Sequence, residues 1–303
     1  MVDFKQALAD RQSSFDALVE SVSKLKEKAP QTVYEGDDPR FWTLKRDKSG
    51  NGSAIIRFLP CTEKGKEPYV RLFKHEFKGP TGSWYIENCL STIGKKDPVM
   101  EMNSELWNSG SEVAKEQARR QKRKLRIYSV IYVVKDPAAP ENEGKVFFYR
   151  YGQKIFDMIN DQMFPVDDEL ESEPKKPVNP FDLIDGCNFK LVCRTEEGKF
   201  PNYDKSKFSD PAPLFATKKG EPDLEKIEAV WNQIYPLDEI VSEDKFKTVE
   251  QLKTRLNRVL GTGATIEEDI PFEPDTNSGS IATESSEDDD EAMKLFKQLA
   301  DGN

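Results

Sequence analysis

The sequence is poor in the residues that metalloenzymes and hydrolases use for chemistry. It has a single histidine, His75, among its 303 residues, which rules out the paired histidines of a zinc protease. It contains neither a glycine-rich phosphate loop ending in Lys-Ser or Lys-Thr nor a Gly-x-Ser-x-Gly nucleophile motif. Its 55 acidic residues are so numerous that pairs of carboxylates arise by chance and carry no catalytic weight. The sequence therefore predicts a protein that is not an enzyme.

Long apolar segments are also lacking. No run approaches the ~18 apolar residues that a membrane span needs. The opening residues, MVDFKQALAD, lack the basic-then-apolar layout of a signal peptide. The 4 cysteines are scattered, which is typical of a reducing compartment and not of a disulfide scaffold. We expect a protein that is not secreted, has no membrane partner and works in the cytoplasm.

The net charge of −10 is unevenly distributed. Twelve acidic residues in the segment 266–303 are opposed only by Lys294 and Lys297, so this segment carries the whole −10 and residues 1–265 sum to zero. The segment 115–154, by contrast, holds eleven basic and four acidic residues. A neutral body with a basic centre can bind a polyanion, which a uniformly acidic surface would repel.

Composition and periodicity divide the chain into three parts. Residues 1–30 carry Phe, Leu and Val at helical spacing, which predicts an amphipathic arm. Residues 31–263 mix short β-branched and aromatic runs with a few helical patterns, without a regular βαβ alternation. Residues 264–303 lose aromatics and gain Ser, Asp, Glu and Gly, the composition of a disordered tail. We expect a mainly β fold with helical additions (α+β), built on a small antiparallel barrel.

The central part yields specific element predictions. The expected strands are Ser53–Leu59, Tyr69–Phe77, Ser83–Glu87, Leu125–Lys135, Lys145–Tyr151 and Asn188–Arg194. The expected helices are Ser104–Lys124, Gln153–Gln162, Leu224–Ile234 and Thr248–Leu260. Residues 199–207 are expected to form a loop.

A basic run next to aromatic residues is the strongest functional signal. Its cations are Arg119, Arg120, Lys122, Arg123, Lys124 and Arg126, and they lead directly into a predicted strand. The accompanying residues are Tyr128, Tyr149, Phe200, Tyr203, Lys205 and Lys207. Cations can follow the phosphates of a single-stranded nucleic acid while rings stack on its bases, at ~1–3 kcal/mol per base. Alternatively, the cations form a solvated helix face and the strand aromatics belong to the core.

A 15-residue run carries a resemblance to a known family. Residues 133–147, VVKDPAAPENEGKVF, closely resemble the single-stranded-DNA-binding, helix-destabilising proteins of T-even-type bacteriophages. Shorter matches at Ile56–Pro60, Trp84–Glu87 and Asn202–Phe208 add to it, and the likeness is good over residues 45–210. The resemblance implies an OB-fold core, an arm for cooperative self-association along DNA and an acidic tail that binds phage replication and recombination proteins. It also implies that this tail competes with DNA for the basic cleft.

The resemblance assigns roles residue by residue. It implies that residues 122–124 contact the DNA backbone and that Tyr149, Phe200 and Tyr203 line the cleft. Tyr128 stands where the family has tryptophan, and Arg126 where it has serine. The expected function is sequence-nonspecific, cooperative coating and protection of single-stranded DNA in the infected bacterial host. The protein would remove secondary structure and recruit replication, recombination and repair proteins.

The family's zinc site is altered in this chain. The family holds zinc with one histidine and three cysteines, and His75 and Cys89 match the first two. Asp97 and Met100 stand where the family has its other two cysteines. Because methionine is a poor zinc ligand, we expect no tightly bound zinc and no other cofactor, with apolar packing in the place of the metal.

Other interpretations remain open on sequence alone. Neither stacking nor phosphate contact excludes RNA, so an RNA-binding regulator is one alternative. A protein-interaction scaffold whose acidic tail is the active element is another. A nuclease ranks last, for want of a metal-binding set of carboxylates. The arm is also atypical, since the family's Lys/Arg-rich motif is reduced here to the single basic residue Arg11 beside Ser13 and Ser14.

Overall fold

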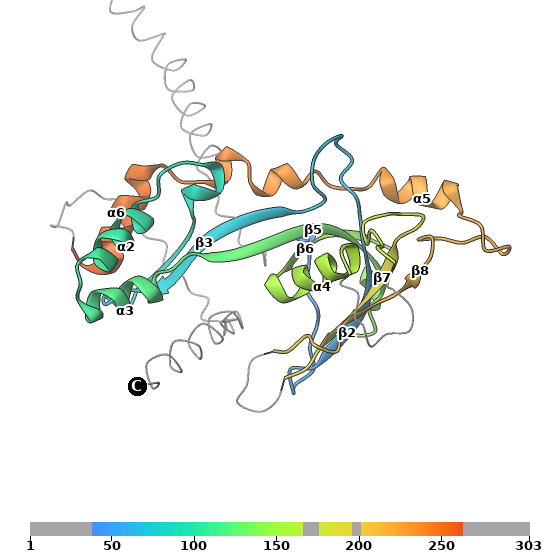
Figure 1. Cartoon of the computed structure of the whole chain (residues 1–303), viewed down its shortest axis with the longest axis horizontal. Helices are drawn as coiled ribbons and strands as arrows, with labels where there is room; N and C mark the ends of the chain where they lie inside the picture. The colour runs from blue at the N-terminus through green and yellow to red at the C-terminus, as the bar shows by residue number, and fades with distance from the viewer. Residues whose placement is uncertain (1–37, 166–175, 196–200, 263–303) are drawn as a thin grey trace, which may run out of the picture. The chain divides into compact units, whose positions relative to one another are not determined.

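A single sheet dominates the computed structural model, which describes residues 38–165, 176–195 and 201–262 (Figure 1). Its strands are Phe41–Trp42 (β1), Gly52–Phe58 (β2), Val70–Lys78 (β3), Trp84–Asn88 (β4), Lys124–Lys135 (β5), Val146–Tyr151 (β6), Cys187–Cys193 (β7) and Lys207–Pro211 (β8). All the strands expected from the sequence are present to within one residue at each end. Two were not expected. The two-residue β1 pairs in parallel with β6, and β8 pairs with β7 where the loop prediction ended.

The main helices are Pro98–Asn108 (α2), Glu112–Arg120 (α3), Gln153–Met163 (α4), Leu224–Trp231 (α5) and Val249–Leu260 (α6). The prediction of one helix over Ser104–Lys124 was wrong, because two helices meet at Gly110, whose φ of 77° favours glycine. Helix α6 begins with a capping box between Thr248 and Gln251. The mixture of a sheet with helices confirms the α+β class.

The long strand β5 is the centre of the sheet because three strands pair along it. Its residues 124–128 pair with β3, and its residues 131–135 pair with β2 on the same edge. Its opposite edge pairs with β6. In Figure 1, β3 and β5 extend together toward α2 and α3, so the chain's basic run enters the sheet beside these helices.

The hydrophobic residues form two clusters. In one, Ile56 of β2 and Phe189 of β7 pack with Ile159 of α4. In the other, Phe77 of β3 belongs with Leu256 of α6 and with residues of α5. Buried residues alternate with half-buried or exposed ones along β7, which places Cys187 and Cys193 on the core face of this strand.

The 15-residue run that carries the family resemblance forms the β5–β6 connection. Asp136 is 0% exposed, and its carboxylate accepts the indole N–H of Trp42 at 2.9 Å. It also accepts the backbone N–H of Ala139 at 3.2 Å and the side-chain N–H of Asn142 at 3.4 Å. The Asp136 N–H in turn donates to the Glu143 carboxylate at 2.9 Å. The segment with the most specific family resemblance therefore uses buried hydrogen bonds to order the β5–β6 connection and to attach it to β1.

Some predictions lie beyond these observations. The arm and the tail fall on residues 1–37 and 263–303, outside the described residues, so the three-part division stays a prediction. Among the described strands the order runs from β1 to β8 without pairing between those two, so barrel closure also stays a prediction. In the described ranges no helix has both the length and the apolar character to cross a membrane.

Candidate nucleic-acid interface

The basic run begins on the last turn of α3. Arg119 and Arg120 lie there, where the partial negative charge of the helix end favours cations. Both contact Glu116 of the preceding turn, at 3.3 and 3.2 Å. The Arg120 side chain is still 77% exposed, and Lys122 just beyond the helix is exposed too. This end of α3 presents positive charge to solvent.

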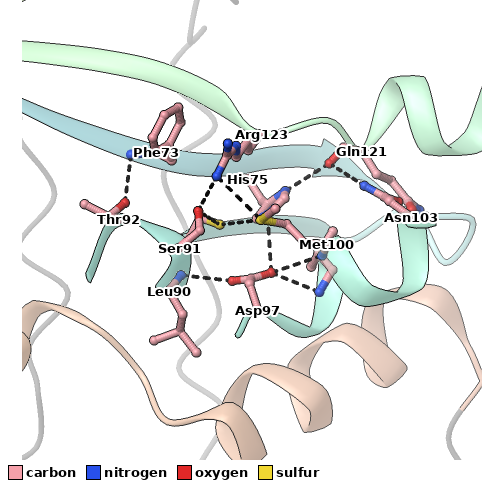
Figure 2. Close-up of polar contacts among 12 residues, drawn as sticks. Phe73, His75, Leu90, Ser91, Thr92, Asp97, Met100, Asn103, Gln121 and Arg123 are labelled. Carbon is pink, nitrogen blue, oxygen red and sulfur yellow. Dashed lines mark hydrogen bonds and ion pairs between the residues drawn. The ribbon is translucent and has the colours of Figure 1, made fainter. Parts of the chain in front are cut away.

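Arg123 lies between the sheet and the turn after β4, and it contacts both. Its guanidinium lies 4.0 Å from the centre of the Phe73 ring, a close cation–π contact. The same group donates to the hydroxyl of Ser91 and lies 3.6 Å from the sulfur of Met100 (Figure 2). Arg123 therefore has a structural role whether or not it also contacts a ligand.

Lys124 and Arg126 share one carboxylate on the neighbouring strand. Arg126 Nη2 donates to Glu76 Oε2 at 2.8 Å, and Lys124 Nζ lies 3.9 Å from the same oxygen. These side chains are 12–20% exposed, so the three charges are partly shielded from water.

A tryptophan that the sequence reasoning missed stands beside this basic run. Trp107, near the end of α2, is 46% exposed, and the guanidinium of Arg119 lies 5.4 Å from its ring centre. An exposed ring next to a cation is the arrangement on which a base can stack. No signal in the sequence marked Trp107, because it lies outside the basic run and its helix α2 was not predicted as a separate element.

Two predicted stacking residues lie in the core. Tyr128 is 1% exposed and Tyr149 is 6% exposed. Tyr149 packs against Trp42, Phe58 and Tyr151. Neither ring presents an open face for a base in this arrangement, so the described structure favours the core interpretation of these two residues.

The remaining predicted residues lie around β8. Tyr203 is half-buried, and its hydroxyl accepts a hydrogen bond from Arg46 at 3.1 Å. Lys205 and Lys207 are exposed. Phe200 lies outside the described residues. A continuous interface between this group and the α3–β5 group stays a prediction.

The remnant of the family's metal site is a buried cluster. His75 is 1% exposed, and its Nδ1–H donates to the backbone carbonyl of Gln121 at 2.9 Å. Its Nε2 lies 3.3 Å from Oδ1 of Asp97, an ion pair not aligned as a hydrogen bond. Burial would lower the pKa of His75, but Asp97 and Cys89 outweigh it and raise the pKa to about 9. Burial likewise opposes ionisation of Asp97, yet His75 holds its pKa below the usual value.

Asp97 is already engaged with the backbone on both sides. Its Oδ2 accepts the N–H of Leu90 at 3.0 Å. Its Oδ1 caps the start of α2 by accepting the N–H groups of Val99 and Met100, at 3.0 and 3.3 Å. This carboxylate therefore orders the turn and the helix without any further ligand.

The cluster does not fit a closed zinc site. A structural zinc ion takes four donors, whereas His75, Cys89 and Asp97 are the candidate ligands found within 4.8 Å of one another in the described residues. The sulfur of Met100 lies 3.7 Å from Cys89 Sγ, but the guanidinium of Arg123 stands beside it and would oppose a second cation (Figure 2). Polar contacts thus occupy the place for which apolar packing was expected, and that expectation was wrong. The absence of zinc stays a prediction.

Comparison with known proteins shows the family to which this chain belongs. The family model described as gp32 DNA binding protein like matches residues 50–260. The single-stranded DNA-binding protein of Enterobacteria phage T2 is 41% identical over 235 residues, which cover 76% of this chain and 73% of that protein. Its counterpart in Enterobacteria phage T4 is 40% identical over 233 residues, with the same coverage. The resemblance to T-even-type phage proteins is confirmed, and the chain belongs to the gp32-like family of DNA-binding proteins.

Proposed function

We propose that this protein binds single-stranded DNA without reading its sequence. The observation that carries the proposal is the family membership, with about two fifths of the aligned residues identical to those of two phage proteins called single-stranded DNA-binding protein. The exposed cations at the end of α3, beside the exposed ring of Trp107, supply suitable chemistry. Cations neutralise phosphates in any nucleic acid, but an aromatic side chain can stack only on bases that are not held in a duplex. Such a surface therefore prefers single strands to duplex.

We further propose how this binding acts on DNA and which parts of the chain contribute to it. A ligand that binds single strands better than duplex shifts the equilibrium toward open strands, so the protein removes hairpins by mass action. We place this activity in an OB-fold core of residues 31–263, with self-association through residues 1–30. The acidic segment 264–303 recruits replication, recombination and repair proteins and competes with DNA for the cations. The protein acts without catalysis or tightly bound zinc, in the cytoplasm of the infected bacterium.

The test is a titration with poly(dT) at several salt concentrations, against duplex of equal length and poly(rU). The informative variant combines Arg120→Glu with Lys122→Glu, because both side chains are exposed and reversal leaves the core intact. We expect affinity for poly(dT) to fall at least about tenfold and the salt slope to flatten by about 1.4, from ~0.7 per phosphate contact. The matched control, Lys218→Glu with Lys219→Glu, reverses two exposed cations in the turn before α5.

Each outcome separates the alternatives. Equal losses in the two double variants would mean that overall charge, and not this surface, governs binding. Equal wild-type affinity for duplex and single strands would refute the proposed function and favour the scaffold interpretation. Tighter binding to poly(rU) than to poly(dT) would favour an RNA-binding regulator.

A further inference from the structure

Glu76 stands in the middle of the positive charges on the β3–β5 pair. It accepts a hydrogen bond from Arg126 at 2.8 Å and lies 3.9 Å from Lys124 Nζ. No pairing or helical-capping role explains a carboxylate here, since the residue opposite Glu76 on β4 is the apolar Ile86. The side chain of Glu76 is 18% exposed, so its carboxylate is partly shielded from water without being buried in the core.

The register of the strands explains why an acid is needed. Lys74 of β3 lies directly opposite Lys124 of β5, and Arg126 lies opposite Leu72 on the same face. Like charges directly opposite each other destabilise a sheet. Glu76 follows Lys74 on that face, and its carboxylate contacts two cations, Lys124 and Arg126. The group therefore keeps a positive surplus that one more anion could satisfy.

We propose that Glu76 is an internal substitute for a DNA phosphate. In the DNA-free protein it holds Lys124 and Arg126, and it gives up the guanidinium when a phosphate of the single strand arrives. This inference rests on the proposed function and adds a regulatory residue to that surface. It makes Glu76 a residue that stabilises the free protein and weakens its binding to DNA.

The chemistry of the pair allows such an exchange. A guanidinium binds carboxylate and phosphate oxygens with the same planar donors. Arg126 gives Glu76 a bond from Nη2, while its buried Nε has no hydrogen-bond partner in the described structure. Because the side chain of Arg126 is only 12% exposed, the pair is screened less by salt than an exposed one, and its loss should be measurable.

The test uses two substitutions that should act in opposite directions. Glu76→Gln removes the negative charge and keeps the shape, so the free protein should unfold at lower temperature while affinity for poly(dT) rises about tenfold. Arg126→Gln leaves Glu76 as a carboxylate facing the DNA, with Lys124 still beside it, so affinity should fall about tenfold. Glu225→Gln and Lys219→Gln are exposed controls that change the net charge by the same amounts and should leave affinity within about twofold.

The signs of the effects decide the proposal. If the wild type binds poly(dT) but Glu76→Gln does not tighten binding, the inference is overturned while the proposed function stands. If Glu76→Gln does not fold, Arg126→Gln decides: unchanged affinity overturns the inference, and a fall beyond that of Lys219→Gln supports it. If the wild type does not prefer single strands to duplex, the proposed function itself fails.

Discussion

Substitution of Asp136 by asparagine tests whether the family's most specific segment is structural. The carboxylate accepts three hydrogen bonds, and both of its oxygens are used: Oδ1 by the N–H of Ala139 and Oδ2 by the side chains of Trp42 and Asn142. Asparagine has the same shape but only one accepting oxygen. With this oxygen toward Trp42 and Asn142, the buried amide N–H of the new asparagine faces the Ala139 N–H, which keeps its bond to the backbone carbonyl of residue 136 at 3.1 Å. A flip of the amide would instead remove the acceptor of Trp42 and Asn142, so one buried donor lacks a partner in either orientation.

The expected loss of stability follows from these hydrogen bonds. A hydrogen bond to a charged group contributes ~1.5–3 kcal/mol, and a buried donor left without a partner costs ~1–3 kcal/mol. Because Asp136 is 0% exposed, water cannot replace the lost acceptor, and we expect Asp136→Asn to lower the free energy of unfolding by about 3–5 kcal/mol. Urea unfolding followed by tryptophan fluorescence measures it. The exposed Asp185→Asn serves as the control and should stay within about 0.5 kcal/mol of the wild type.

Two further measurements test this reasoning. Trp42→Phe removes only the indole donor, so a double-mutant cycle with Asp136→Asn should give a coupling energy of about 1 kcal/mol or more. A coupling near zero would mean that the 2.9 Å bond does not stabilise the fold. Folded Asp136→Asn should also bind poly(dT) within about twofold of the wild type. Lost affinity with unchanged stability would instead make this loop part of the DNA surface.

The other predictions concern α2 and the cluster around His75. Because the pKa of His75 is raised to about 9, its pairing with Asp97 should stabilise the fold fully below the unfolded pKa of ~6.5 and weaken as pH rises through 9. His75→Gln should remove that pH dependence of urea unfolding. Asp97→Cys with Met100→Cys should restore four donors, so cobalt should give a tetrahedral thiolate spectrum that the wild type does not show. Trp107→Ala should cost about 1–3 kcal/mol of poly(dT) binding, measured by titration, whereas the exposed Trp231→Ala on α5 should cost nothing.

The chain's class and its strands could be predicted because they rest on local patterns. Runs of β-branched and aromatic residues between turns indicated β2 to β7, since side chains that alternate between two faces leave a period of two in the sequence. The two-residue β1 was missed because it has no such period and is held only by its pairing with β6. The break between α2 and α3 was missed because one glycine interrupts an otherwise helical composition.

Residue types and their order along the chain determined the family, the basic run and the loss of the zinc cysteines. Only the tertiary structure decided which of those residues face solvent. Tyr128 and Tyr149 have the sequence signature of stacking residues but lie in the core, whereas Trp107 stands exposed beside Arg119. Likewise, nothing in the sequence joins Glu76 to Arg126, which are fifty residues apart. The physical reason is that a strand's alternation specifies which residues share a face, while the charges and rings that meet there depend on which strands pair.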